Sequence, residues 1–169
     1  NDIDGEAAHD WSGSSVALNS DGTILAIGAI YNDGNDDIDS RRGHVRIYKN
    51  ISGSWQQIGS DIDGEGITDL SGSSVSLSSD GTILAIGAQY NNGNGTDSGH
   101  VRVFRYLNGE WNQIGSDIDG EASHDKSGRS VSLSSDGTIL AIGASENDGN
   151  GNKSGHVRVY KFTGWGLGT

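Results

Sequence analysis

The chain has 169 residues, of which 32% are hydrophobic, 28 are glycine and none is proline or cysteine, and its formal net charge is −12. This composition favours a globular, turn-rich protein and excludes a collagen-like chain, disulfides, thiolate metal sites and a cysteine nucleophile. The negative charge disfavours nucleic acid and anionic membrane surfaces as partners, and no apolar run approaches the roughly 18 residues of a membrane span. Because the chain begins at Asn1 and contains no methionine, we expect it to be processed or to be a piece of a longer protein.

The segment Asp-Ile-Asp-Gly-Glu occurs three times and divides the chain into similar units. It begins at Asp2, Asp61 and Asp117, at intervals of 59 and 56 residues, and similar sequence follows each copy. Internal repeats of this length indicate that each copy is one structural unit stacked on the next. The predicted units are residues 1–60, 61–116 and 117–169.

The first half of unit two predicts two strands joined by a tight turn. Residues 74–78 alternate polar and apolar side chains, which is the period of a strand. Residues 79–81, Ser-Asp-Gly, have the residue types of a hairpin turn. Residues 82–88 are apolar without alternation, which is typical of a strand covered on both faces.

The second half of unit two predicts a loop and two further strands. Residues 90–99 are rich in Asn and Gly, residues 100–104 alternate again, and an Asn-Gly turn at 108–109 precedes a fourth strand at 111–115. No helical period is sustained anywhere. Four antiparallel strands per unit predict an all-β fold, a β-propeller of four-stranded blades, with three blades in this chain.

The predicted connections place the long loops on one face of the propeller. In an up-and-down blade, the loop between strands two and three lies on the same face as the link to the next blade, and here both are long, acidic and rich in amides. Loops on a rigid scaffold are where binding usually resides. The candidate ligand-binding residues on this face are Trp11, Asn32, Asp33, Asn91, Asn92, Asn147 and Asp148.

Three motifs in unit two resemble a known repeat. Ser-Gly-Ser-Ser-Val at 71–75, Ile-Gly-Ala at 86–88 and Ser-Gly-His-Val-Arg-Val at 98–103 are similar to the FG-GAP repeats of integrin α-chain propellers and their bacterial and algal relatives. The hairpin at 77–83 also resembles turns of WD-repeat and TolB-type propellers. The resemblance implies an extracellular or cell-surface propeller that serves adhesion or structural assembly.

The sequence departs from that family at two places. Serine replaces the phenylalanine of the Phe-Gly motif, and the calcium loop between strands one and two is reduced to a tight turn with a single aspartate. The calcium sites of the family therefore cannot be transferred to these turns. The serines are Ser12, Ser71 and Ser127, and the aspartates are Asp21, Asp80 and Asp136.

The repeated Asp-Ile-Asp-Gly-Glu segments are the candidate metal sites. Closely spaced carboxylates on a short turn suit Ca²⁺, which takes 6–8 oxygen ligands. The alternative is that each aspartate only caps its turn through bonds to the backbone. The candidate Ca²⁺ ligands are Asp2, Asp4, Glu6, Asp61, Asp63, Glu65, Asp117, Asp119 and Glu121.

Other residues recur at matching positions. His44, His100 and His156 each open the third strand, where we expect a structural hydrogen bond rather than a metal ligand. A tryptophan recurs in the fourth strand, at Trp55, Trp111 and Trp165, where packing between blades is commoner than sugar stacking. Asn50, Asn94 and Asn152 lie in sequons and are the candidate N-glycosylation sites of a secreted protein.

The sequence predicts a binding protein rather than an enzyme. Nearly every polar residue is repeated threefold, so no single copy holds a unique catalytic constellation. The expected partner is a protein or a glycan on the loop-rich face, and the alternative is a lectin or a glycan-hydrolysing propeller. Because a closed ring typically needs about four to eight blades, we expect further blades from a second copy or from the same longer polypeptide.

Overall fold

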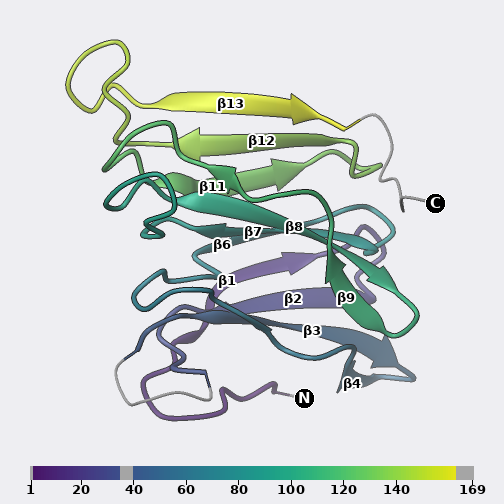
Figure 1. The fold of residues 1–169 in the computed structure, drawn as a ribbon. Coiled ribbons are helices and arrows are strands. Elements are labelled where there is room, and N and C mark those ends of the chain that lie inside the picture. The colour runs from purple at the N-terminus through teal and green to yellow at the C-terminus, as the bar shows by residue number, and fades with distance from the viewer. Residues whose placement is uncertain (1, 35–39, 163–169) are drawn as a thin grey trace.

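Every regular element of the described chain is a β-strand. The computed structural model describes residues 2–34 and 40–162, and its strands form three antiparallel sheets stacked in chain order (Figure 1). In these two ranges no helix is long and apolar enough to span a membrane. The predicted all-β fold with three propeller blades is confirmed.

The first two sheets contain five strands each and the third contains three. Blade one comprises β1 (Ser12–Leu18), β2 (Ile24–Ala29), β3 (His44–Ile51), β4 (Ser54–Gln57) and β5 (Ile62–Asp63). Blade two comprises β6 (Ser74–Leu77), β7 (Ile83–Ala88), β8 (His100–Leu107), β9 (Glu110–Gln113) and β10 (Ile118–Asp119). Blade three comprises β11 (Ser127–Leu133), β12 (Ile139–Ala144) and β13 (His156–Lys161), and the strand predicted around Trp165 lies outside the described residues.

The outermost strand of a blade is made of two pieces. In blade one, β4 and β5 both pair with β3, through Tyr48↔Gln57 and Val45↔Ile62. In blade two, β9 and β10 both pair with β8 in the same way. The blade therefore takes its last strand from the first residues of the next sequence unit, and this offset brings the Asp-Ile-Asp segment onto the edge of the preceding blade.

The hairpins between the first two strands of each blade are held by a local aspartate. In blade two, the Asp80 carboxylate accepts hydrogen bonds from the Ser78 hydroxyl at 2.7 Å and the Thr82 amide at 3.0 Å. Gly81 supplies the left-handed backbone of the turn, with φ of 72°. These short hairpins lie on one side of the stack and the long loops on the other (Figure 1).

The hydrophobic core lies between the blades rather than within them. Ile86 of β7 packs with residues of blade one, and Ile142 of β12 packs with residues of blade two; both are 1% exposed. The predicted burial of the continuous apolar strand is thus confirmed. The stacking of blade faces explains why these strands lack polar alternation.

Close approach of neighbouring blades explains the Gly of the Ile-Gly-Ala motif. A Cβ atom on Gly28 would lie 2.2 Å from the Gly72 carbonyl oxygen, and one on Gly87 would lie 2.0 Å from the Gly128 carbonyl oxygen. No side chain fits at these distances, so the residues that begin the following blade approach the bare backbone of the preceding one. Gly143, in blade three, faces no such carbonyl among the described residues.

Candidate functional site

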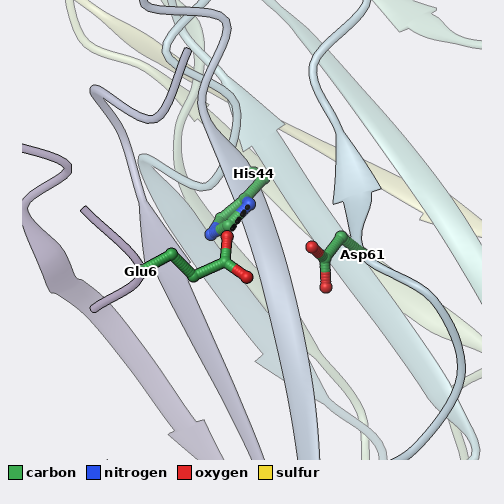
Figure 2. A group of neighbouring side chains, drawn as sticks. All are labelled: Glu6, His44 and Asp61. Carbon is green, nitrogen blue, oxygen red and sulfur yellow. Dashed lines mark ion pairs between the residues drawn. The ribbon is translucent and has the colours of Figure 1, made fainter. Parts of the chain in front are cut away.

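Three groups of glutamate, histidine and aspartate side chains recur at equivalent places of the blades. In the first, His44 opens β3, Glu6 comes from the link before blade one, and Asp61 comes from the segment between β4 and β5; Figure 2 shows the two carboxylates beside the imidazole. The donor atoms of the three side chains lie within 4.8 Å of one another. The His44 Nδ1 atom is 3.7 Å from Glu6 Oε2, and the His44 side chain is 2% exposed.

The second group repeats the first one blade further along. His100 opens β8, Glu65 comes from the link between blades one and two, and Asp117 precedes β10. The His100 Nδ1 atom is 4.0 Å from Glu65 Oε2, and the His100 side chain is also 2% exposed. Each complete group therefore joins a link, a third strand and an outer strand.

The third group has a different aspartate. His156 Nδ1 lies 3.5 Å from Glu121 Oε2, as in the other groups, but the third carboxylate is Asp125 of the link. The Asp125 Oδ2 atom already accepts hydrogen bonds from the Ala122 amide at 3.0 Å and the Asn147 amide at 2.9 Å. The position that matches Asp61 and Asp117 lies past Thr169.

An arginine on the third strand lies beside the glutamate in each of the first two groups. Arg46 Nη1 lies 3.7 Å from Glu6 Oε1, and Arg102 Nη1 lies 3.7 Å from Glu65 Oε1. Each arginine also donates a hydrogen bond from Nη2 to a backbone carbonyl of the preceding segment, Arg46 to Asp4 at 2.8 Å and Arg102 to Asp63 at 2.6 Å. The arginines therefore tie the incoming link to the blade.

Burial shifts the titration of the two central histidines. Burial lowers the pKa of the His44 imidazole below its usual 6.5, and the nearby Asp61 and Glu6 carboxylates only partly oppose this effect. Burial likewise lowers the pKa of His100, and the neighbouring Arg102 guanidinium lowers it further. Both imidazoles are therefore neutral at pH 7 and keep a nitrogen lone pair.

The structure distributes the predicted Ca²⁺ ligands among different groups. Within one Asp-x-Asp-Gly-Glu segment, the first aspartate joins the histidine of the blade that is ending, and the glutamate joins the histidine of the blade that follows. The backbone carbonyl of the second aspartate accepts a hydrogen bond from the following blade's arginine, as in the Arg158–Asp119 bond. Sequence reasoning expected these histidines to make structural hydrogen bonds rather than to be ligands. The available signal for a shared site was that His44 and His100 each lie 17 residues before the next acidic segment, which begins at Asp61 and at Asp117.

Three of the predicted ligand-binding residues lie inside the loops. The Asn91 side chain is buried, donates a hydrogen bond to Asp69 Oδ2 at 2.9 Å and accepts one from the Gly93 amide at 2.7 Å. Asn32 and Asn147 make the same bonds in blades one and three. These amides hold each loop against the preceding link. Of the remaining candidates, Asn92, Asp148 and Trp11 are exposed and Asp33 is half-buried.

Trp11 belongs to a recess on the loop face. Its side chain is 60% exposed and meets the Tyr31 ring edge-on, with 4.6 Å between ring centroids. The recess has a volume of about 340 Å³, and its lining includes His9, Asp33 and Arg41. At the matching position of blade three, Lys126 is buried and its Nζ lies 3.6 Å above the Tyr90 ring. The exposed tryptophan of the recess is therefore a feature of blade one that the matching position of blade three lacks.

The remaining candidates have structural surroundings. Trp111 packs against the core and donates a hydrogen bond from Nε1 to the Ile58 carbonyl at 3.1 Å, which is a packing role. Among the sequon residues, Asn50 lies within β3, and the Asn94 amide donates to the Gly120 carbonyl at 2.9 Å. Asn152 is exposed on a loop.

The fold places the chain among proteins of the β-propeller type, and the comparisons agree. The chain is 15% identical to a putative 6-phosphogluconolactonase from Bacteroides uniformis, with a TM-score of 0.56 over 86% of this chain and 35% of that one. It is 21% identical to the Pseudomonas aeruginosa periplasmic gluconolactonase PpgL, with a TM-score of 0.52 over 88% of this chain and 39% of that one. It is 15% identical to a chain in the complex of KlAtg21 with the coiled coil of AgAtg16, with a TM-score of 0.58 over 88% and 39%.

These likenesses show the fold alone, and the chain spans well under half the length of each of these proteins. No curated protein matches the sequence. The FG-GAP repeat matches residues 62–104 and 117–160, together just over half of the chain. The chain belongs to the FG-GAP repeat family, as its motifs predicted.

The prediction that the chain is not an enzyme is wrong. The structural neighbours include a putative 6-phosphogluconolactonase and a gluconolactonase, so the same stacked blades occur in proteins of an enzyme class. The physical error lay in requiring a unique constellation within one unit. Titratable side chains from different units meet at the blade junctions, as in the Glu-His-Asp groups. The threefold repetition of polar residues is therefore no argument against catalysis.

Proposed function

We propose that this chain is an assembly module, a stretch of β-propeller that joins further blades of the same repeat and presents its acidic loop face to a protein or glycan outside the cell or at its surface. The observation that supports this proposal is the exposure of apolar side chains at the two open ends of the stack. Their counterparts inside the stack are buried.

The open face of blade three supports docking of a following blade. Val157 is 67% exposed and Val159 is 66% exposed, both on β13. The matching residues of blade two, Val101 and Val103, are 0% and 2% exposed, because blade three covers them. These valines are exposed on blade three, whereas their counterparts inside the stack are buried. This difference favours docking of a further blade of the same kind on the exposed face.

The open face of blade one is the complementary surface. Val16 and Leu18 of β1 are 62% and 57% exposed. Their counterparts in β6, Val75 and Leu77, pack against the core between blades one and two. Because the chain already packs a first-strand Val and Leu against a preceding blade, a further blade fits each end without a new kind of contact.

Sedimentation of the purified chain over a concentration series tests the assembly proposal. We expect species heavier than 17.6 kDa, and we expect Val157→Lys with Val159→Lys to shift the equilibrium towards the monomer. A control pair of substitutions on exposed polar residues of the same blade, Asn150→Lys and Asn152→Lys, keeps the added charge but leaves the patch intact. A stable, well-folded monomer at every concentration contradicts the proposal.

A screen for binding partners tests the proposed role of the loop face. Immobilised chain is screened against extracellular proteins and a glycan array, with turnover of the bound glycans measured in parallel. Asn92→Lys and Asp148→Lys, which add positive charge to this face, should weaken the binding of a protein partner that carries basic groups. Binding that survives these changes places the partner elsewhere.

A second candidate, glycan binding, is favoured by the recess around Trp11. An exposed indole beside a tyrosine ring offers a flat apolar surface for a sugar, and Asp33 and Arg41 add polar groups at its rim. Trp11→Ala should abolish glycan-array signals if the recess is the site. Trp111→Ala, which removes a packed indole, is the matched control for lost aromatic area.

A further inference from the structure

We propose that the Glu6–His44–Asp61 and Glu65–His100–Asp117 groups each bind a first-row transition dication of the Zn²⁺ type, through one imidazole nitrogen and two carboxylate oxygens. The proposal differs from the calcium prediction in its ligands and in its ion. It is independent of the assembly role proposed above.

Within each group, the distances between the imidazole and the carboxylates fit a bound metal ion better than a direct hydrogen bond. The Nδ1-to-carboxylate distances of 3.7 and 4.0 Å exceed the roughly 3.2 Å limit of an N–H···O hydrogen bond. Within the residues that the structure describes, neither the His44 nor the His100 imidazole makes any hydrogen bond, although each side chain is 2% exposed. Two ligand atoms on a tetrahedral Zn²⁺ are about 3.4 Å apart, given Zn–N and Zn–O lengths of about 2.1 Å. A small inward movement of the carboxylates therefore completes the site.

Neighbouring side chains hold the carboxylates in place. Gln113 Nε2 donates a hydrogen bond to Asp117 Oδ1 at 2.7 Å, and Gln57 makes the same bond to Asp61. The glutamate is oriented by the arginine, which approaches Oε1 and leaves Oε2 facing the imidazole. Outer hydrogen bonds of this kind orient metal ligands and tune their affinity.

The local charge also favours a dication. The charged groups that act on His44 are the carboxylates of Asp61, Glu6 and Asp63 and the guanidinium of Arg46. Three negative charges and one positive charge leave an excess of two negative charges around a neutral donor. The imidazole then selects among cations, since Ca²⁺ and Mg²⁺ take oxygen ligands whereas imidazole suits Zn²⁺, Cu²⁺ and Ni²⁺.

A bound ion would fasten each link to the blade that it enters. Glu65 lies in the link after β5, His100 lies on β8, and Asp117 lies on the outer edge of blade two. One ion coordinated by all three closes a loop between segments that are far apart in the sequence. The third group has an Asp125 that is already engaged by two amides, so we expect it to bind more weakly.

Calorimetric titration of the chelator-treated chain with Zn²⁺ tests the proposal. We expect two strong sites, loss of one site in His44→Gln and in His100→Gln, and loss of both in the double variant. Gln113→Ala should weaken one site by about 10–100-fold, the usual effect of removing an outer hydrogen bond. Co²⁺ should give the visible absorption of a low-coordinate nitrogen and oxygen site, absent in the double variant.

The controls separate lost ligands from lost folding. His9→Gln and His124→Gln remove exposed histidines outside the complete groups and should leave both sites unchanged. Circular dichroism in chelator should show that the double variant keeps the wild-type β signal and melts cooperatively. The proposal is overturned if the folded double variant binds Zn²⁺ as tightly as the wild type. It is also overturned if Ca²⁺ binds these groups and Zn²⁺ does not.

Discussion

Replacing Gly87 with alanine tests whether the spacing between blades determines the Ile-Gly-Ala motif. The new Cβ atom would lie 2.0 Å from the Gly128 carbonyl oxygen and 2.4 Å from Ser74 Oγ. The serine side chain can rotate away, but the carbonyl belongs to the backbone of blade three. The blades must therefore separate by about 1 Å to restore the roughly 3.0 Å of the shortest real Cβ contacts. Gly143→Ala is the matched control, because its Cβ would meet Ser130 Oγ at 2.4 Å and no backbone atom closer than 3.8 Å.

The magnitude follows from two opposing effects. Overpacking of a close interface costs about 1–3 kcal/mol, whereas the smaller conformational freedom of unfolded alanine returns about 0.4–1 kcal/mol. Gly143→Ala avoids the overpacking cost but still reduces the conformational freedom of the unfolded chain. We therefore expect this variant to be as stable as the wild type or slightly more stable. At about 2–4 °C per kcal/mol for a domain of this size, Gly87→Ala should melt up to about 10 °C below the wild type and about 2–12 °C below Gly143→Ala.

Thermal and urea unfolding, followed by tryptophan fluorescence in dilute protein, measure both variants. Dilution matters because docking of a further blade on blade three would give Gly143 the same close neighbour. Equal melting temperatures for Gly87→Ala and Gly143→Ala would refute the reasoning, since they would show that the backbone contact between blades does not limit this position.

Three further predictions follow from the same structure. Ile86→Ala should cost about 2–5 kcal/mol in unfolding free energy, against less than about 0.5 kcal/mol for Val159→Ala in the monomer, and similar losses would mean that Ile86 is not sandwiched. The pKa values of His44 and His100 in the folded chain lie below 6.5, so the unfolded chain takes up protons first as the pH falls. The stability of the metal-free chain should therefore decline from about pH 6.5 down to the lowered pKa of the folded state. A urea midpoint that stays constant over that range would contradict the burial argument. Hydrogen bonds from Ser134 and Thr138 lower the pKa of Asp136 to about 2, so its carboxyl resonance should titrate near pH 2, and an ordinary midpoint near 3.8 would show that these bonds do not form in solution.

Local sequence was sufficient for the strands and turns of this protein. The Ser-Asp-Gly hairpin forms because aspartate bonds its own turn and glycine adopts positive φ, and both effects act within five residues. The continuous apolar run at 83–88 indicated a strand covered on both faces, and Ile86 is buried between two blades. Recurrence of these signals was enough to predict three blades, and the motifs were enough for the family.

Tertiary structure alone decided which side chains meet. The sequence places Asp61 and Glu65 in one segment, but the break between β4 and β5 puts Asp61 on blade one, and the link carries Glu65 to blade two. Likewise, nothing local distinguishes Asn91, which is buried against Asp69, from Asn92, which is exposed. Strand pairing and blade stacking bring together residues that are tens of positions apart in the sequence. The alternation of polar and apolar residues predicts the strands, but it does not show which segment will lie against the edge of each blade.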